Sequence, residues 1–189
     1  MTSSTAPGTR PVSESPPEDI ALLERAMRPY AHKDTVYLHR ARAEHRGEHV
    51  VGAGDFAIAQ SCYIDDTGHF NAVEFTISYN QLFYYTLAAA IRDRFIPELA
   101  DWSLDDYWVR QLPSVLISRF DSHYRRPIDP HAYHAELTIG AVEFRHRSRP
   151  LLALRTHVEF TDTATGSASG DIEIVLVDPP RPDSRETGR

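Results

Sequence analysis

The sequence predicts an α+β domain in which an antiparallel sheet wraps around one apolar helix. Residues 80–94 are apolar on nearly every helical face, and β-branched segments with period-two alternation fill the C-terminal half. A helix without a polar face must be enclosed by other elements, and a curled antiparallel sheet can enclose it. This arrangement is the hot-dog fold, although other α+β layouts remain open on sequence alone.

The first expected elements are one helix and two strands. Apolar residues in 20–27 recur near helical spacing, and Pro29 is expected to end that helix. Residues 35–43 and 50–59 combine β-branched, aromatic and small residues with loose alternation, which predicts two strands.

The central helix has an ambiguous start. Residues 73–79 alternate apolar and polar side chains as a strand would, yet they also step by three and four as a helix would. In residues 80–94 the helical pattern is the stronger one, and Pro97 follows its end. Ser103 is the expected N-cap of a short second helix.

The C-terminal half is expected to consist of strands. Its β-branched, alternating segments are residues 114–120, 132–147, 151–162 and 169–177. The turn residues between Asp162 and Gly166 predict that the last two strands form a hairpin.

Composition limits the class of protein. We expect one domain over residues 18–178, with Ser-, Pro- and Gly-rich disordered tails at 1–17 and 179–189. A net charge of -7 gives no reason to expect a nucleic-acid partner. A single cysteine excludes a disulfide within the chain, and no apolar run suggests a secretory signal or a membrane span. A cytoplasmic location fits these features.

Polar residues that suit catalysis gather just before and within the start of the apolar helix. They are Ser61, Tyr63, Asp65, Asp66, His69, Asn71, Glu74 and Asn80. His69 has the side chain best suited to act as an acid or a base near neutral pH. Asn71, Asn80 and the backbone N–H groups of a helix start can donate to an anionic oxygen. The alternative is an ordinary turn, with Asn80 as a buried amide bonded to nearby backbone.

Other kinds of site are less well supported. His131, His134 and His146 do not have the spacing of a metal site, so no metal and no cofactor is expected. Cys62 has no evident partner base and is expected to be a small buried residue. Arg125 and Arg126 lie in a basic segment that suits coenzyme A phosphates, an acidic carrier protein or simply a solvated strand end.

Several separated motifs resemble the FcoT-type family of hot-dog thioesterases. They are "RPY", "TGHFNAVE", "NQL", "WSLDDY" and "RRP", spread over residues 28–177. The resemblance implies either hydrolysis of long-chain acyl-CoA or addition of glycine to the β-carbon of a 2-enoyl thioester on an acyl carrier protein. The second activity belongs to the biosynthesis of isonitrile lipopeptides and β-amino acid starter units.

The resemblance also implies the site residues. Carried over onto this sequence, they are Tyr30, Tyr63, Asn71 and Asn80, with His69 inside the same motif. Ser61, Gly68, Arg125 and Arg126 are further candidates for substrate binding, with Arg125, Arg126 or Tyr63 holding the glycine carboxylate, and Glu74 is an alternative base.

We therefore expect an enzyme that adds glycine to an enoyl group on an acyl carrier protein, with release of the N-carboxymethyl-3-amino acid as a further step. A plain thioesterase and a non-catalytic acyl-binding protein are the alternatives. Because hot-dog domains usually pair to complete their sites, a homodimer or a higher homo-oligomer is expected.

Overall fold

The computed structural model describes residues 17–146 and 149–179. Its helices are α1 (Pro17–Ala31), α2 (Ala72–Arg92) and α3 (Leu104–Arg110), with a 3-10 turn at Pro97–Leu99. Its strands are β1 (Leu38–Arg46), β2 (His49–Phe56), β3 (Val115–Arg126), β4 (Tyr133–His146), β5 (Pro150–Asp162) and β6 (Ser167–Val177).

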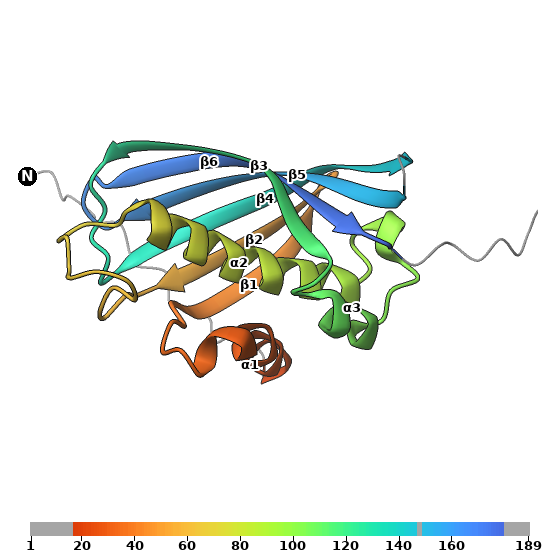
Figure 1. Cartoon of the computed structure of the whole chain (residues 1–189), viewed down its shortest axis with the longest axis horizontal. Helices are drawn as coiled ribbons and strands as arrows, with labels where there is room; N and C mark the ends of the chain where they lie inside the picture. The colour runs from red at the N-terminus through yellow and green to blue at the C-terminus, as the bar shows by residue number, and fades with distance from the viewer. Residues whose placement is uncertain (1–16, 147–148, 180–189) are drawn as a thin grey trace, which may run out of the picture.

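The described strands form one antiparallel sheet in the order β1-β2-β4-β5-β6-β3. The sheet curves around α2, which lies along its concave face, while α1 and α3 lie beside the same helix (Figure 1). The predicted hot-dog arrangement is therefore confirmed. The β5–β6 hairpin and the Ser103 cap of α3 are confirmed as well.

The central helix is buried because the sheet comes unusually close to it. Every residue from Gln81 to Ile91 is buried. Gly52 of β2 faces Thr86, and a Cβ atom at position 52 would collide with the Thr86 side chain. Strand β2 can therefore pass directly against α2 only because residue 52 lacks a side chain.

Several predicted element ends are wrong. Helix α1 continues through Pro29 to Ala31, because a proline in the last turn removes only one helical hydrogen bond. Strand β1 starts three residues later than expected, at Leu38, and β2 ends at Phe56 rather than residue 59. The strand alternative for residues 73–79 is also wrong, since α2 begins at Ala72.

Strand β3 is longer than the predicted segment of residues 114–120 and continues to Arg126. Its polar second half pairs with β6, for example His123 with Ser169. Apolar alternation could not reveal this half, because β3 is an edge strand whose side chains there are largely exposed.

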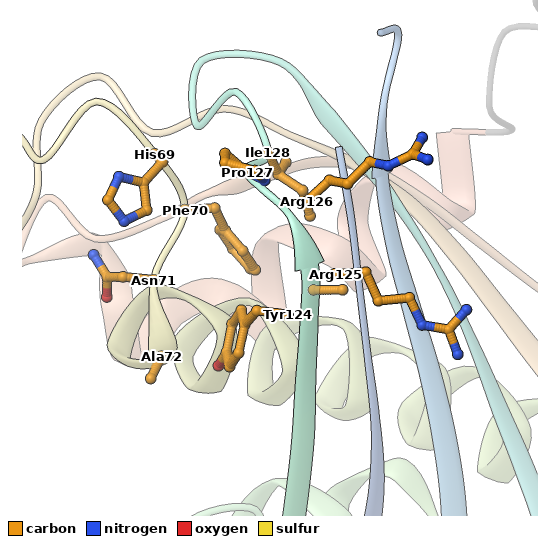
Figure 2. A pocket seen from close by; sticks show the side chains of 10 residues that line it. His69, Phe70, Asn71, Ala72, Tyr124, Arg125, Arg126, Pro127 and Ile128 are labelled. Atoms are coloured by element: carbon orange, nitrogen blue, oxygen red, sulfur yellow. The ribbon is translucent and has the colours of Figure 1, made fainter. Parts of the chain in front are cut away.

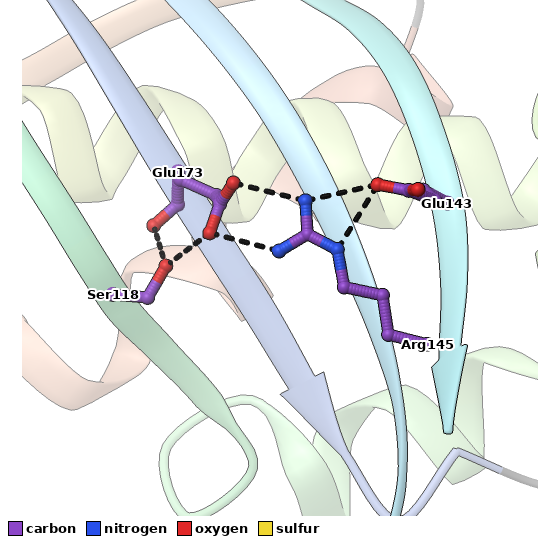
Figure 3. A network of polar contacts seen from close by, with 4 residues as sticks. All are labelled: Ser118, Glu143, Arg145 and Glu173. Atoms are coloured by element: carbon purple, nitrogen blue, oxygen red, sulfur yellow. Dashed lines mark hydrogen bonds and ion pairs between the residues drawn. The ribbon is translucent and has the colours of Figure 1, made fainter. Parts of the chain in front are cut away.

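The outer face of the sheet carries a polar network that ties three strands together (Figure 3). Arg145 of β4 contacts Glu173 of β6 through both terminal nitrogens, at 3.2 Å each, and Glu143 at 2.9 Å. Ser118 of β3 donates to Glu173 at 2.8 Å. The network spans β5 and links the edge strand β3 to β6 and β4.

The predicted tails lie almost entirely outside the described residues. Across residues 17–146 and 149–179, none of the helices is long and apolar enough to cross a membrane.

Candidate active site

Asn71 is the N-cap of α2 and forms a capping box with Glu74. Its side-chain Oδ1 accepts hydrogen bonds from the N–H groups of Val73 at 3.0 Å and Glu74 at 3.4 Å. The Glu74 carboxylate in turn accepts from the Asn71 N–H at 3.1 Å. The box therefore uses three backbone N–H groups that the sequence analysis had treated as free donors for an anionic oxygen.

The nitrogen of the Asn71 amide takes no part in the capping box. This Nδ2 is buried and has no hydrogen-bond partner among the described residues. Buried amides nearly always have partners, so an unpartnered one beside a cavity suggests a bound group. Asn71 lines a pocket of about 380 Å³, together with His69, Phe70, Tyr124 and Ile128 (Figure 2).

His69 lies beside Asn71 on an exposed turn. Its Nδ1 is 3.0 Å from the Thr67 carbonyl oxygen, which can only accept, so Nδ1 carries the proton. In the neutral ring, Nε2 is then the unprotonated nitrogen and can take a proton from a substrate. Gly68 allows the turn because its φ of 73° lies in the left-handed region, and its N–H donates to Asp66.

Phe70 fixes the positions of His69 and Asn71 on either side of it. Its ring is buried against Tyr133 and Phe160, with centroid distances of 4.9 and 5.1 Å. Its N–H donates to the Ile128 carbonyl at 3.0 Å. The apolar anchor thus holds two polar side chains at the mouth of one pocket.

A buried polar cluster lies beneath the capping box. Glu74 is 3% exposed, and the hydroxyls of Ser78 and Tyr133 lie 2.7 Å apart. Burial raises the pKa of the Tyr133 phenol well above its usual value, the bond to Ser78 opposes this, and the charge of Glu74 adds to it. Tyr37 belongs to the same cluster, since Glu74 also contributes to raising its pKa, after burial and Cys62.

The remaining candidates in the connection between β2 and α2 lie in different environments. Tyr63 is 45% exposed. The Ser61 hydroxyl is buried and has no partner among the described residues. Cys62 is exposed, so its expected burial is wrong.

Arg125 and Arg126 line the pocket, but both guanidinium groups extend away from His69 and Asn71 (Figure 2). A register shift between Tyr124 and Arg126 breaks the usual alternation of β3. The expectation that these arginines hold a glycine carboxylate beside His69 is therefore not supported within one chain.

Tyr30 and Asn80 are far from Asn71 along α2. The Tyr30 ring packs 6.4 Å from that of Tyr84, and burial raises its phenol pKa. Tyr84 lies thirteen residues beyond Asn71, which is a rise of about 20 Å along a helix. Asn80 is partly exposed, so the expectation that it is a buried amide is wrong.

Gln81 is the buried amide of this helix, and sequence reasoning missed it. Its Oε1 accepts from the N–H groups of Tyr37 and Leu38 at 2.9 Å each, and its Nε2 donates to the Thr35 carbonyl at 2.6 Å. Only its position within an apolar run pointed to this role. Sequence reasoning also missed Tyr37, Ser78 and Tyr133, because each looks like an ordinary core or strand residue in the sequence.

Two of the three histidines considered for metal binding have other contacts. His131 Nδ1 lies 3.0 Å from the Ile58 carbonyl oxygen, and His134 Nδ1 lies 2.9 Å from an Asp55 carboxylate oxygen. Among the described residues, no cluster of three or more potential metal ligands occurs.

Comparison with known proteins places these features in a family. Residues 25–176 match the FcoT-like thioesterase domain. The chain belongs to this family. Proteins of the family named (2E)-enoyl-ACP glycyltransferase include one from Mycobacterium marinum, 38% identical, with 84% of this chain and 86% of that protein covered. A second, from Mycobacterium tuberculosis, is 37% identical over 92% of this chain and 91% of its own length.

A third protein with the same name, from Streptomyces coeruleorubidus, is 35% identical, with 86% of this chain and 99% of that protein covered. Among solved structures, a thioesterase from Thermus thermophilus is 21% identical, with 69% of this chain and 81% of that chain covered, at a TM-score of 0.43. The sequence resemblance to the FcoT family is thus confirmed over most of the chain.

Proposed function

We propose that this member of the FcoT-like family adds the amine of glycine to the β-carbon of a 2-enoyl thioester carried by an acyl carrier protein. The names of its relatives support this reaction, since they describe enoyl-ACP glycyltransferases at 35–38% identity. The observation in this chain that carries the proposal is the unpartnered Asn71 Nδ2 beside His69, at the mouth of one pocket.

The proposed chemistry follows from these two side chains. The glycine nitrogen forms a bond to the β-carbon, and the electrons of the C=C bond move toward the thioester oxygen. Asn71 Nδ2 donates to that oxygen as its negative charge develops. His69 Nε2 takes the proton lost by the nitrogen and then gives a proton to the α-carbon, which completes the addition and restores the neutral ring.

Hydrolysis of the same thioester is a proposed second step that releases the N-carboxymethyl-3-amino acid. It builds negative charge on the same oxygen, so the same donor serves both reactions. A plain acyl-CoA or acyl-carrier thioesterase would use this pocket with water alone. The role of the product as a precursor of isonitrile lipopeptides, and the cytoplasmic location, remain predictions from the sequence.

A second copy of the chain is proposed to complete the site. Val73 is 41% exposed on the outer side of α2, and Asn80 lies partly exposed two turns further along. Leu116 and Ile117 of the edge strand are also exposed, at 41% and 40%. Pairing along this side would bury these apolar groups and bring Tyr30, Tyr63 and Asn80 of the two copies near the pockets.

The test is mass spectrometry of the acids formed from a short 2-enoyl thioester on a carrier protein, with and without isotopically labelled glycine. A product with the labelled nitrogen on the β-carbon would support addition. Free 2-enoic acid that is unaffected by glycine would instead establish a thioesterase. His69→Ala should abolish most of the labelled product, whereas His157→Ala, on the outer face of the sheet, should not.

A further inference from the structure

A second pocket lies against the connection between β2 and α2, beside the turn that follows α1. Its volume is about 680 Å³, compared with about 380 Å³ for the pocket beside His69 and Asn71. The residues that matter here are Lys33, Tyr37, His39, Ser61, Cys62 and His131. Neither His69 nor Asn71 lines this pocket, so the mechanism above leaves it without a role.

Two residues that line this pocket carry buried hydroxyl groups without hydrogen-bond partners within the described chain. Tyr37 is 2% exposed, and its Oη is buried without a partner. The thiol and the backbone of Cys62 both act on the Tyr37 phenol, although neither contact meets the distance and angle limits of a hydrogen bond. The Ser61 Oγ is likewise buried and unpartnered. Such groups are destabilising when left alone, so a ligand that accepts from both hydroxyls would explain them.

Charge at the rim of the pocket favours a small zwitterion. Lys33 has no carboxylate partner among the described residues, and the Asp34 carboxylate lies next to it in the chain. His39 and His131 are held by the carbonyls of Ala57 and Ile58. The rim thus offers one cationic and one anionic group beside two hydroxyl donors.

The pocket is connected to the proposed reaction site along the chain. The connection between β2 and α2 itself joins the two pockets, since residues 57–62 line the second pocket and residues 69–72 line the first. A ligand in the second pocket would therefore lie near the catalytic end of α2.

We propose that the second pocket binds the glycine cosubstrate, with its carboxylate accepting hydrogen bonds from Tyr37 and Ser61 and facing the Lys33 ammonium. This inference rests on the proposed function and replaces Arg125 and Arg126 as the carboxylate site. Tyr37 is a binding residue in this proposal, and its hydroxyl is the group that recognises the amino acid.

Tyr37→Phe tests the proposal because it removes only the hydroxyl. Loss of a hydrogen bond to a carboxylate should raise the glycine KM about tenfold to a hundredfold, while the KM for the enoyl carrier protein stays unchanged. The variant should fold at least as stably as the original chain, since a buried hydroxyl without a partner contributes nothing to the free protein. Ser61→Ala should raise the glycine KM in the same direction.

Tyr85→Phe is the matched control. Tyr85 is fully buried, and its hydroxyl also lacks a partner in the described residues, but it does not line this pocket. Its removal should leave both KM values unchanged. Glycine should also raise the melting temperature of the original chain and of Tyr85→Phe, but not that of Tyr37→Phe.

The outcomes separate this inference from the proposed function. If the original chain adds glycine and Tyr37→Phe keeps the original glycine KM, the pocket assignment is overturned and the reaction stands. A raised KM for the enoyl carrier protein alone would also overturn it, because the pocket would then hold the pantetheine arm. If the original chain adds no glycine, the proposed function fails, and an absent melting shift with glycine would remove the pocket assignment as well.

Discussion

Replacing Asn71 with serine separates the two roles of this side chain. Its Oδ1 caps α2, while its Nδ2 is buried, unpartnered and proposed to donate to the thioester oxygen. Serine caps helices about as well as asparagine, because its hydroxyl oxygen accepts from the same first-turn N–H groups. It is shorter and has no amide, so it cannot place a donor where Nδ2 lies.

The expected magnitudes follow from these two roles. Loss of one preorganised donor to an oxyanion costs about 2.7–4 kcal/mol of transition-state stabilisation, so turnover by Asn71→Ser should fall about 100- to 1000-fold. Its free energy of unfolding should change by less than about 0.5 kcal/mol. Asn71→Ala should lose as much turnover and also about 1 kcal/mol of stability, which lowers the melting temperature by about 2–4 °C for a chain of this size.

The assay combines single-turnover formation of the glycine adduct with thermal unfolding of each variant. Turnover by Asn71→Ser within about threefold of the original would refute the donor role. Equal stability of the serine and alanine variants would instead show that the cap contributes little.

Three further predictions concern stability and proton transfer. Gln81→Leu leaves two N–H groups and one carbonyl of the Thr35–Leu38 segment unpaired, so it should cost about 3 kcal/mol and lower the melting temperature by about 6–12 °C. Gln111→Leu, which loses one such bond, should cost about a third of that. Hydrogen bonds from Arg145 and then Ser118 lower the pKa of Glu173. The ionised carboxylate therefore stabilises the fold fully when the pH is above the pKa that Glu173 has in the unfolded chain. This stabilisation is lost as the pH falls through the lower pKa that Glu173 has in the folded chain. Urea unfolding should therefore show Glu173→Gln destabilised at neutral pH, with the difference from the original shrinking as the pH falls through the lowered pKa of Glu173. His69→Gln should slow adduct formation about 100-fold or more without changing the melting temperature, and an unchanged rate would exclude His69 as the base.

Much of the fold could be predicted because it depends on local patterns. The apolar run of residues 80–94 predicted a buried central helix, and alternation predicted the four C-terminal strands. The start of α2 could not be decided in this way, because residues 73–79 satisfy both periods. The capping box at Asn71 and Glu74 decides it, since it satisfies first-turn N–H groups that only a helix leaves unpaired.

The sequence by itself determined the α+β class with its enclosed central helix, the family and the short segment that carries His69 and Asn71. These depend on residue types at close spacing, which a linear chain records directly. Only the tertiary structure decided which side chains meet there. Tyr37 and Tyr133 lie 44 and 55 residues from their contacts Gln81 and Ser78, so only the packing of α2 against the sheet brings them together. The register shift in β3 beside Arg125 and the burial of unpartnered hydroxyls at the second pocket are likewise features that local periodicity does not encode.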